Sequence, residues 1–85
     1  MRRRTNIFII MQLLELLMEE PRGPTRLAQA ANLNYQTCEG YLAILLADDL
    51  VAKDSREEHE VYSATPKGKD LFFRWEKIYE ELDLP

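Results

Sequence analysis

Apolar residues recur at helical spacing in three stretches of the chain, and a short stretch of different character separates the last two. In residues 5–20 the apolar positions follow three- and four-residue steps, which predicts a first helix that Thr5 or Asn6 caps. Its apolar arc is wider than one core face requires, and the residues that widen it are Phe8, Ile9, Leu13 and Leu16. We therefore expect a second surface to cover part of this helix.

Residues 24–48 predict two helices joined by a short turn. Asn32-Leu33-Asn34 interrupts the helical pattern with residues that favour turns and N-caps. After this turn one helical face collects Cys38, Tyr41, Leu42, Leu45 and Leu46, and the opposite face collects Gln36, Thr37, Glu39, Gly40 and Ala43. The pattern is typical of a helix-turn-helix whose second helix packs with one face and exposes the other.

A hairpin and a last helix are predicted after residue 48. Residues 50–64 place two strand-like segments around a charged stretch, residues 55–59, which would form a wing. Thr65-Pro66 then sets a capping hydroxyl before a proline suited to a first helical turn, which predicts a helix over residues 66–82. Along this helix an apolar seam follows four-, three- and four-residue steps through Leu71, Trp75, Ile78 and Leu82, with Phe72 and Tyr79 beside it.

Besides these patterns, three short motifs resemble those of a known protein family. They are Leu33-Asn34-Tyr35, then Tyr41-Leu42 with Leu45, and then Tyr62 with Thr65 and Gly68. Over residues 6–82 the chain resembles the small archaeal winged helix-turn-helix transcriptional regulators. The resemblance implies a mainly α fold with a small β-hairpin wing, and a length of 85 residues indicates that residues 1–85 form a single domain. Asp48-Asp49 departs from the family pattern, in which glycine is common between the second helix and the wing.

Duplex DNA is the partner that the resemblance implies, and it assigns roles to particular residues. In DNA-binding helix-turn-helix proteins the start of the second helix enters the major groove, so the candidate base contacts are Asn34, Tyr35, Gln36 and Thr37. Glutamine can bond adenine twice and threonine can touch the thymine methyl group. The candidate phosphate contacts are Arg2, Arg3, Arg4 and Arg26, with Lys53 and Arg56 from the wing. A plain surface role for Gln36 and Thr37 stays open.

The charge distribution supports two function classes. The net charge of −4 argues mildly against nucleic acid, but it is uneven. Residues 1–37 hold five arginines against three glutamates, whereas residues 38–65 hold two basic and seven acidic residues. Because DNA affinity depends on local phosphate contacts, the basic first part is compatible with DNA binding. The alternative is a winged-helix module that binds another protein, which the acidic wing and Glu39 favour.

Residue sets for catalysis or metal binding are missing from the sequence. It has one histidine, one cysteine, and neither a glycine-rich phosphate loop nor a Cys/His cluster, so we expect no enzyme activity, no metal and no cofactor. Cys38 on the inward face is expected to be a packed thiol and not a redox sensor, and His59 a solvated loop residue. No apolar run reaches the roughly 18 residues of a membrane span, and we expect a cytoplasmic protein.

We expect a homodimer, with the C-terminal helix serving in dimerisation, because the apolar faces exceed what 85 residues can bury in one chain. The predicted interface combines the first and last helices, and its residues are Ile9, Leu13, Leu16, Leu71, Phe72, Trp75, Ile78, Tyr79 and Leu82. An aromatic stripe such as that of Phe72, Trp75 and Tyr79 belongs more often to a core or a dimer interface than to a ligand pocket.

Arg2, Arg3 and Arg4 generate a prediction about salt dependence. They precede a helix N-terminus, where the macrodipole disfavours cations, so an external anion such as DNA phosphate explains them better. Deleting all three should flatten the slope of log K against log salt by about 2.7 units per chain. Sequence preference should survive, because phosphate contacts carry no sequence information.

The measurement is a salt titration of the full-length and shortened chains on one duplex, with circular dichroism to show that both are folded. An unchanged slope would mean that the arginines act only as a solubilising tail.

Overall fold

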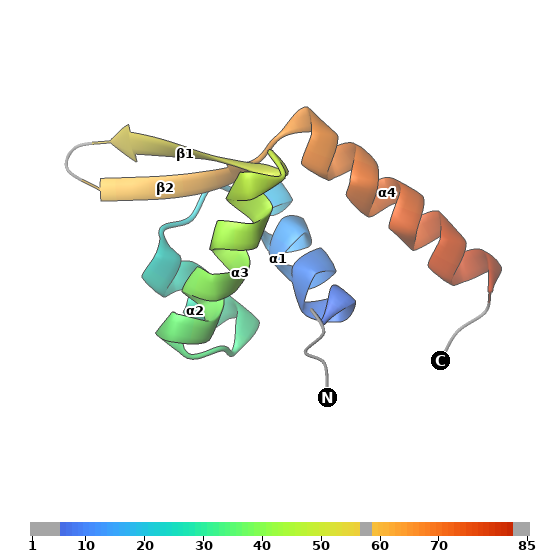
Figure 1. Ribbon diagram of the computed structural model, residues 1–85, viewed down its shortest axis with the longest axis horizontal. Helices are drawn as coiled ribbons and strands as arrows, with labels where there is room; N and C mark the ends of the chain where they lie inside the picture. Colours follow the sequence, from blue (N-terminus) through green and yellow to red (C-terminus); the bar gives the residue numbers. More distant parts are fainter. Residues whose placement is uncertain (1–5, 57–58, 83–85) are drawn as a thin grey trace.

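Four helices and one antiparallel hairpin make up the computed structural model, which describes residues 6–56 and 59–82. The elements follow in the order α1 (Ile7–Glu19), α2 (Pro24–Ala31), α3 (Tyr35–Ala47), β1 (Val51–Arg56), β2 (His59–Ala64) and α4 (Pro66–Glu81). The first three helices form the body, the hairpin projects from one side of it, and α4 extends on the other side (Figure 1). The predicted fold class, a mainly α winged helix-turn-helix, is confirmed.

The helices begin where the sequence supplies capping side chains. Asn6, one of the two predicted caps, caps α1, since its Oδ1 accepts hydrogen bonds from the N–H groups of Phe8 at 3.0 Å and Ile9 at 3.4 Å; the other, Thr5, lies outside the described residues. Thr65 caps α4 by accepting the N–H of Gly68 at 3.0 Å. Side-chain caps of this kind satisfy donors that the first helical turn leaves unpaired. The predicted helix ends accordingly differ from the observed ones by only one or two residues.

α1 is the central helix of the core. It packs against α2, α4 and β2, and it contributes the buried side chains of Ile10, Met11, Leu13, Leu14 and Leu17. The prediction that Leu13 belongs to a dimer interface is wrong, because this side chain is 0% exposed within one chain. The wide apolar arc of α1 is thus covered largely by elements of the same chain, and each buried leucine contributes about 1.5–3 kcal/mol.

The two strands of the hairpin are longer than predicted, although the hairpin itself lies within the predicted residues 50–64. Its register pairs Val51 with Ala64 at the base and Arg56 with His59 at the far end, so parts of the predicted loop lie within the strands. Side chains near this end are exposed, which removes the burial signal on which a strand prediction depends, while backbone pairing continues. Arg22 adds a bridge to β2, with backbone bonds to Tyr62 of 3.1 and 2.8 Å.

The start of α4 is tied to the turn between α3 and β1. The Thr65 hydroxyl donates to the carbonyl of Asp49 at 2.7 Å, and Lys67 Nζ donates to the carbonyl of Asp48 at 2.9 Å. The Thr65 N–H donates to the carbonyl of Leu50 at 3.0 Å. Asp49 has a φ of 60°, the left-handed conformation that glycine adopts most easily. The glycine that the resemblance implies between the second helix and the wing would adopt this conformation without strain, and in this chain Asp49 adopts it.

Gly68 generates the first structural prediction, because a Cβ at this position would lie 2.1 Å from the carbonyl oxygen of Leu50. Gly68→Ala should lower the free energy of unfolding by about 1–3 kcal/mol, since close-packed backbone must move apart. Urea denaturation followed by circular dichroism measures this change.

Gly40 provides the matched control, since nothing lies within 4 Å of a Cβ there. Gly40→Ala should raise the stability by about 0.5–1 kcal/mol through helix propensity alone. Equal stabilities of the two variants would contradict the role given to Gly68.

Candidate nucleic-acid interface

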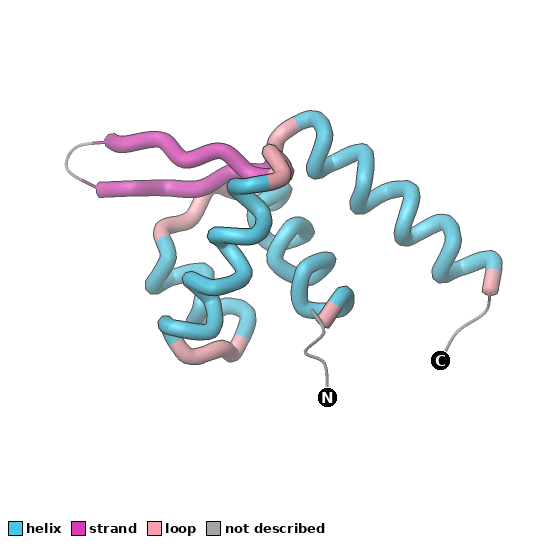
Figure 2. The backbone as a smooth tube through the Cα atoms, viewed as in Figure 1, coloured by secondary structure: helices cyan, strands magenta, loops and turns pink. Residues whose placement is uncertain are grey.

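A three-residue turn sets the position of α3 relative to α2, and it is the short loop between these helices in Figure 2. Asn32 adopts a left-handed conformation with a φ of 59° and a ψ of 44°, which asparagine tolerates better than most residues. Its N–H donates to Gln29 O at 3.1 Å, and the N–H of Leu33 donates to Ala28 O at 2.9 Å. Both bonds satisfy carbonyls at the end of α2, so the turn is defined by its own backbone.

The inner face of α3 attaches it to the body. Cys38, Leu42 and Leu45 are buried, as the spacing predicts. Tyr41 also ties α3 to the start of α1, because its hydroxyl accepts the backbone N–H of Asn6 at 3.3 Å. The helix is therefore fixed on one side, and the opposite side is exposed at Gln36, Thr37, Glu39, Gly40 and Ala43.

Asn34 has a structural role at the beginning of α3. Its Oδ1 accepts the backbone N–H of Thr37 at 2.8 Å and so caps the helix. A cap of this type contributes about 0.5–2 kcal/mol. The carbonyl oxygen of the Asn34 side chain is thus engaged within the protein, and only its amide N–H groups can serve as donors to a base.

Tyr35 and Glu39 interact one turn apart on α3. A hydrogen bond with Glu39 raises the pKa of the Tyr35 hydroxyl above its ordinary value, and partial burial and the charge of Glu39 act in the same direction. The hydroxyl stays protonated at neutral pH. The structure consequently places a carboxylate, held by a tyrosine, on the exposed side of α3.

The only cysteine is a packed core residue. Cys38 is fully buried, and burial raises the pKa of its thiol, with a further contribution from the charge of Glu39. A protonated, buried thiol is a poor nucleophile. The predicted packing role is confirmed.

The predicted phosphate contacts are only partly described. Arg26 is exposed on α2, and Lys53 of β1 pairs with Glu60 of β2 at 3.8 Å. The side chain of Arg56 and all of Arg2, Arg3 and Arg4 lie outside the described part of the chain. Arg22, which the prediction did not include, donates to Leu16 O at 3.3 Å and pairs with Glu19 and Glu20, so its role is structural.

The predicted dimer surface is reduced by the structure. Phe72 lies in the core of its own chain because α4 turns this side chain toward α1, so assigning it to the interface is wrong. On α1, Ile9 and Leu16 are partly buried against the core. They point away from α4, because they lie about 140–160° around α1 from Met11, which lines the space between α1 and α4. A ridge on α4 remains, formed by Leu71, Ile78 and Leu82 with Trp75 at its edge. Leu71 and Trp75 are half-buried against the core, whereas Ile78 is 56% exposed and Leu82 62% exposed.

Sequence reasoning missed an aromatic cluster between α1 and α4. Phe8 meets Trp75 edge-on with ring centroids 5.5 Å apart, and meets Tyr79 edge-on at 6.1 Å. Trp75 stacks on Tyr79 at 4.9 Å with 18° between the ring planes. Such pairs each contribute about 0.5–1.5 kcal/mol beyond burial. The one feature of the sequence that indicated this cluster was the position of Phe8 on the second apolar stripe of α1.

Among the described residues, no group of three or more His, Cys, Asp or Glu side chains is placed to hold a metal ion. None of the helices in this part of the chain has the length and apolar character to cross a membrane.

A family model described as winged helix-turn-helix matches residues 3–83. An uncharacterised protein of Methanocaldococcus jannaschii is 30% identical over 77 residues, and the match covers 91% of this chain and 35% of that protein. The chain thus spans about a third of the length of this relative. The family model and the archaeal relative confirm the resemblance inferred from the motifs.

Solved structures share the fold. Sso10a-2, a DNA-binding protein from Sulfolobus solfataricus, is 27% identical with a TM-score of 0.73, and the match covers 93% of this chain and 85% of that one. The transcriptional regulator BldR of the same organism is 20% identical with a TM-score of 0.80, covering 88% and 56%. A homodimeric winged helix-turn-helix DNA-binding domain from Mycobacterium bovis is 23% identical with a TM-score of 0.76, covering 87% and 69%.

Proposed function

We propose that this chain, which belongs to the winged helix-turn-helix family, is a transcriptional regulator that binds duplex DNA sequence-specifically as a homodimer, with α3 in the major groove. One observation carries the proposal. The first turn of α3 is exposed, while the rest of the helix is fixed to the body by buried side chains and by capped ends. A rigid helix with an exposed N-terminal turn is what groove recognition requires.

Gln36 and Thr37 are the base contacts in this proposal. Both side chains are exposed on the side of α3 that faces away from the core. Glutamine suits the N6 and N7 edge of adenine, and threonine suits the thymine methyl group. Glu39 also fits the major groove, since a carboxylate can accept a hydrogen bond from the N4 amino group of cytosine.

In this proposal the DNA phosphates are contacted by Arg26 and Lys53, together with the N-terminal arginines and Arg56. Lys53 is paired with Glu60 over 3.8 Å, and an exposed pair of this kind is weak, so phosphate can displace the carboxylate. The DNA-binding protein Sso10a-2, which is 27% identical to this chain, supports the assignment to DNA.

A second candidate function is a winged-helix module that binds another protein. It is favoured by the Tyr35–Glu39 interaction and by Glu60 on the hairpin, which together place negative charge near the exposed side of α3. Phosphates are repelled by such charge, whereas a basic protein partner is attracted to it. Retention of duplex DNA by the purified protein separates the two functions.

The homodimer is proposed to form through the α4 ridge of Leu71, Ile78, Leu82 and Trp75. The exposed end of this ridge lies on the half of α4 that extends away from the body (Figure 1). Apolar side chains repeated at four- and three-residue steps suit pairing with a second helix. The homodimeric domain from Mycobacterium bovis, which shares the fold, supports self-association.

The DNA proposal predicts a sequence-selective loss when α3 is altered. Selecting from random duplexes at low and moderate salt should recover a preferred site with two half-sites about 34–36 Å apart, or a multiple of this distance. Replacing Gln36 or Thr37 by alanine should cost about 1–3 kcal/mol on the preferred site and little on random DNA.

Gln12→Ala is the matched control, since this glutamine is exposed on α1 beside α4 and away from α3. Equal losses on both duplexes would show that Gln36 and Thr37 make no base contact. Failure of the unaltered protein to retain any DNA would favour the protein-binding function.

The dimer proposal predicts a mass near twice 10.0 kDa by light scattering at micromolar concentration. Ile78→Glu should dissociate the dimer, because it places a charge in the apolar ridge. Phe73→Glu is the control; Phe73 is 55% exposed on the same helix but about 140° around it from Ile78. A mass near that of one chain for the unaltered protein would contradict the proposal.

A further inference from the structure

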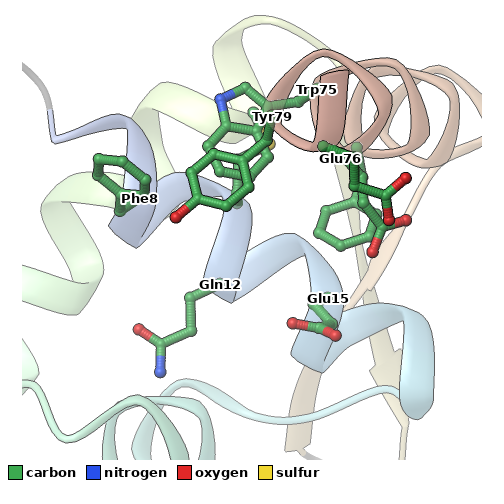
Figure 3. A pocket seen from close by; sticks show the side chains of 9 residues that line it. Phe8, Gln12, Glu15, Trp75, Glu76 and Tyr79 are labelled. Atoms are coloured by element: carbon green, nitrogen blue, oxygen red, sulfur yellow. The ribbon is translucent and has the colours of Figure 1, made fainter. Parts of the chain in front are cut away.

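A cavity of about 420 Å³ lies between α1 and α4. Its floor is apolar, because the side chains of Met11 and Phe72 that line it belong to the buried core. Figure 3 shows the aromatic side chains of Phe8, Trp75 and Tyr79 on one side of it, contributed by both helices. Sites for organic ligands typically have volumes of about 300–1,000 Å³ and mostly apolar walls, so this cavity has the size and lining of a small-molecule site.

The aromatic wall offers ring surface to a ligand. Trp75 and Tyr79 stack on each other, which leaves one face of each ring outside the stack; both are only partly buried, and Phe8 is exposed beside them. The face of an aromatic ring carries negative electrostatic potential, and a cation placed over it is attracted. The wall therefore favours positively charged ligands over negatively charged ones.

The rim of the cavity carries three carboxylates, from Glu15, Glu76 and Glu80. Glu15 and Glu76 lie across from the aromatic side chains in Figure 3. None of the three forms an ion pair with a cation in the described part of the chain, and none of the described residues that line the cavity is basic. The aromatic rings and the unpaired carboxylates are different side chains, and both favour a positively charged ligand.

We infer that this cavity binds an apolar organic cation, whose hydrocarbon part contacts Met11 and the rings while its charge faces the glutamates. The cavity and the α4 ridge proposed for the dimer share Trp75, which lies at the edge of both. Ile78 of the α4 ridge lies about 160° around the helix from both Glu76 and Glu80. The inference is independent of DNA binding and requires only the packing of α1 against α4.

The test uses tetraphenylphosphonium and the fluorescence of Trp75, the only tryptophan in the sequence. Titration of the full-length protein should change the Trp75 emission to saturation. Tetraphenylborate has the same shape and the opposite charge, so it should bind at least tenfold more weakly. Equal affinity for the two ions, or no saturable change with either, would overturn the inference.

Two variants test whether tetraphenylphosphonium binds in this cavity or anywhere on the acidic surface of the protein. Glu76→Gln should weaken tetraphenylphosphonium binding about fivefold, the effect of one charge about 4 Å away in water. Glu81→Gln removes the same charge from the same helix, but Glu81 is absent from the cavity lining, so its effect should be within twofold.

Tyr79→Leu keeps the site apolar and removes one ring, so it should weaken binding about two- to fivefold. Circular dichroism checks that each variant is folded. An effect of Glu81→Gln as large as that of Glu76→Gln would show non-specific attraction to an acidic protein and would overturn the inference.

Discussion

The close approach of Gly68 to the carbonyl of Leu50 is the contact on which the arrangement of the wing and α4 depends. Leu50 ends the turn after α3 and precedes β1, while Gly68 lies in the first turn of α4. Only a residue without a Cβ permits this approach. The bonds from Thr65 and Lys67 to the same turn hold the two segments together, so α3, the hairpin and α4 share one anchoring point.

The sequence predicted the features that neighbouring residues determine. Asn34 and Thr65 cap helices as their spacing indicates, and Cys38 lies on the buried face of α3. Burial that depends on tertiary neighbours was harder to predict. Leu13 and Phe72 were assigned to an interface because periodicity counts apolar faces without showing which element of the same chain covers them. α1 is covered by α2, α4 and β2, a fact that no local pattern contains.

For the candidate site, the exposed residues of α3 followed directly from helical periodicity. The interaction of Tyr35 with Glu39 was also accessible in principle, because residues four apart meet on a helix. The contact of Phe8 with Trp75 joins the first helix to the last helix. The ion pair of Lys53 with Glu60 depends on the register between β1 and β2. Such pairings require the assembled fold.

The hairpin has a further consequence for the behaviour of the protein at high concentration. β2 is flanked by β1 and, at Tyr62, by the isolated bridge from Arg22, whereas no described strand or bridge pairs with the outer edge of β1. An open edge is a template on which strands of other molecules can add. Lys53 and Asp54 occupy this edge strand with exposed charged side chains, and desolvating them disfavours addition of another strand. The polar wing thereby protects the protein against aggregation through its own sheet.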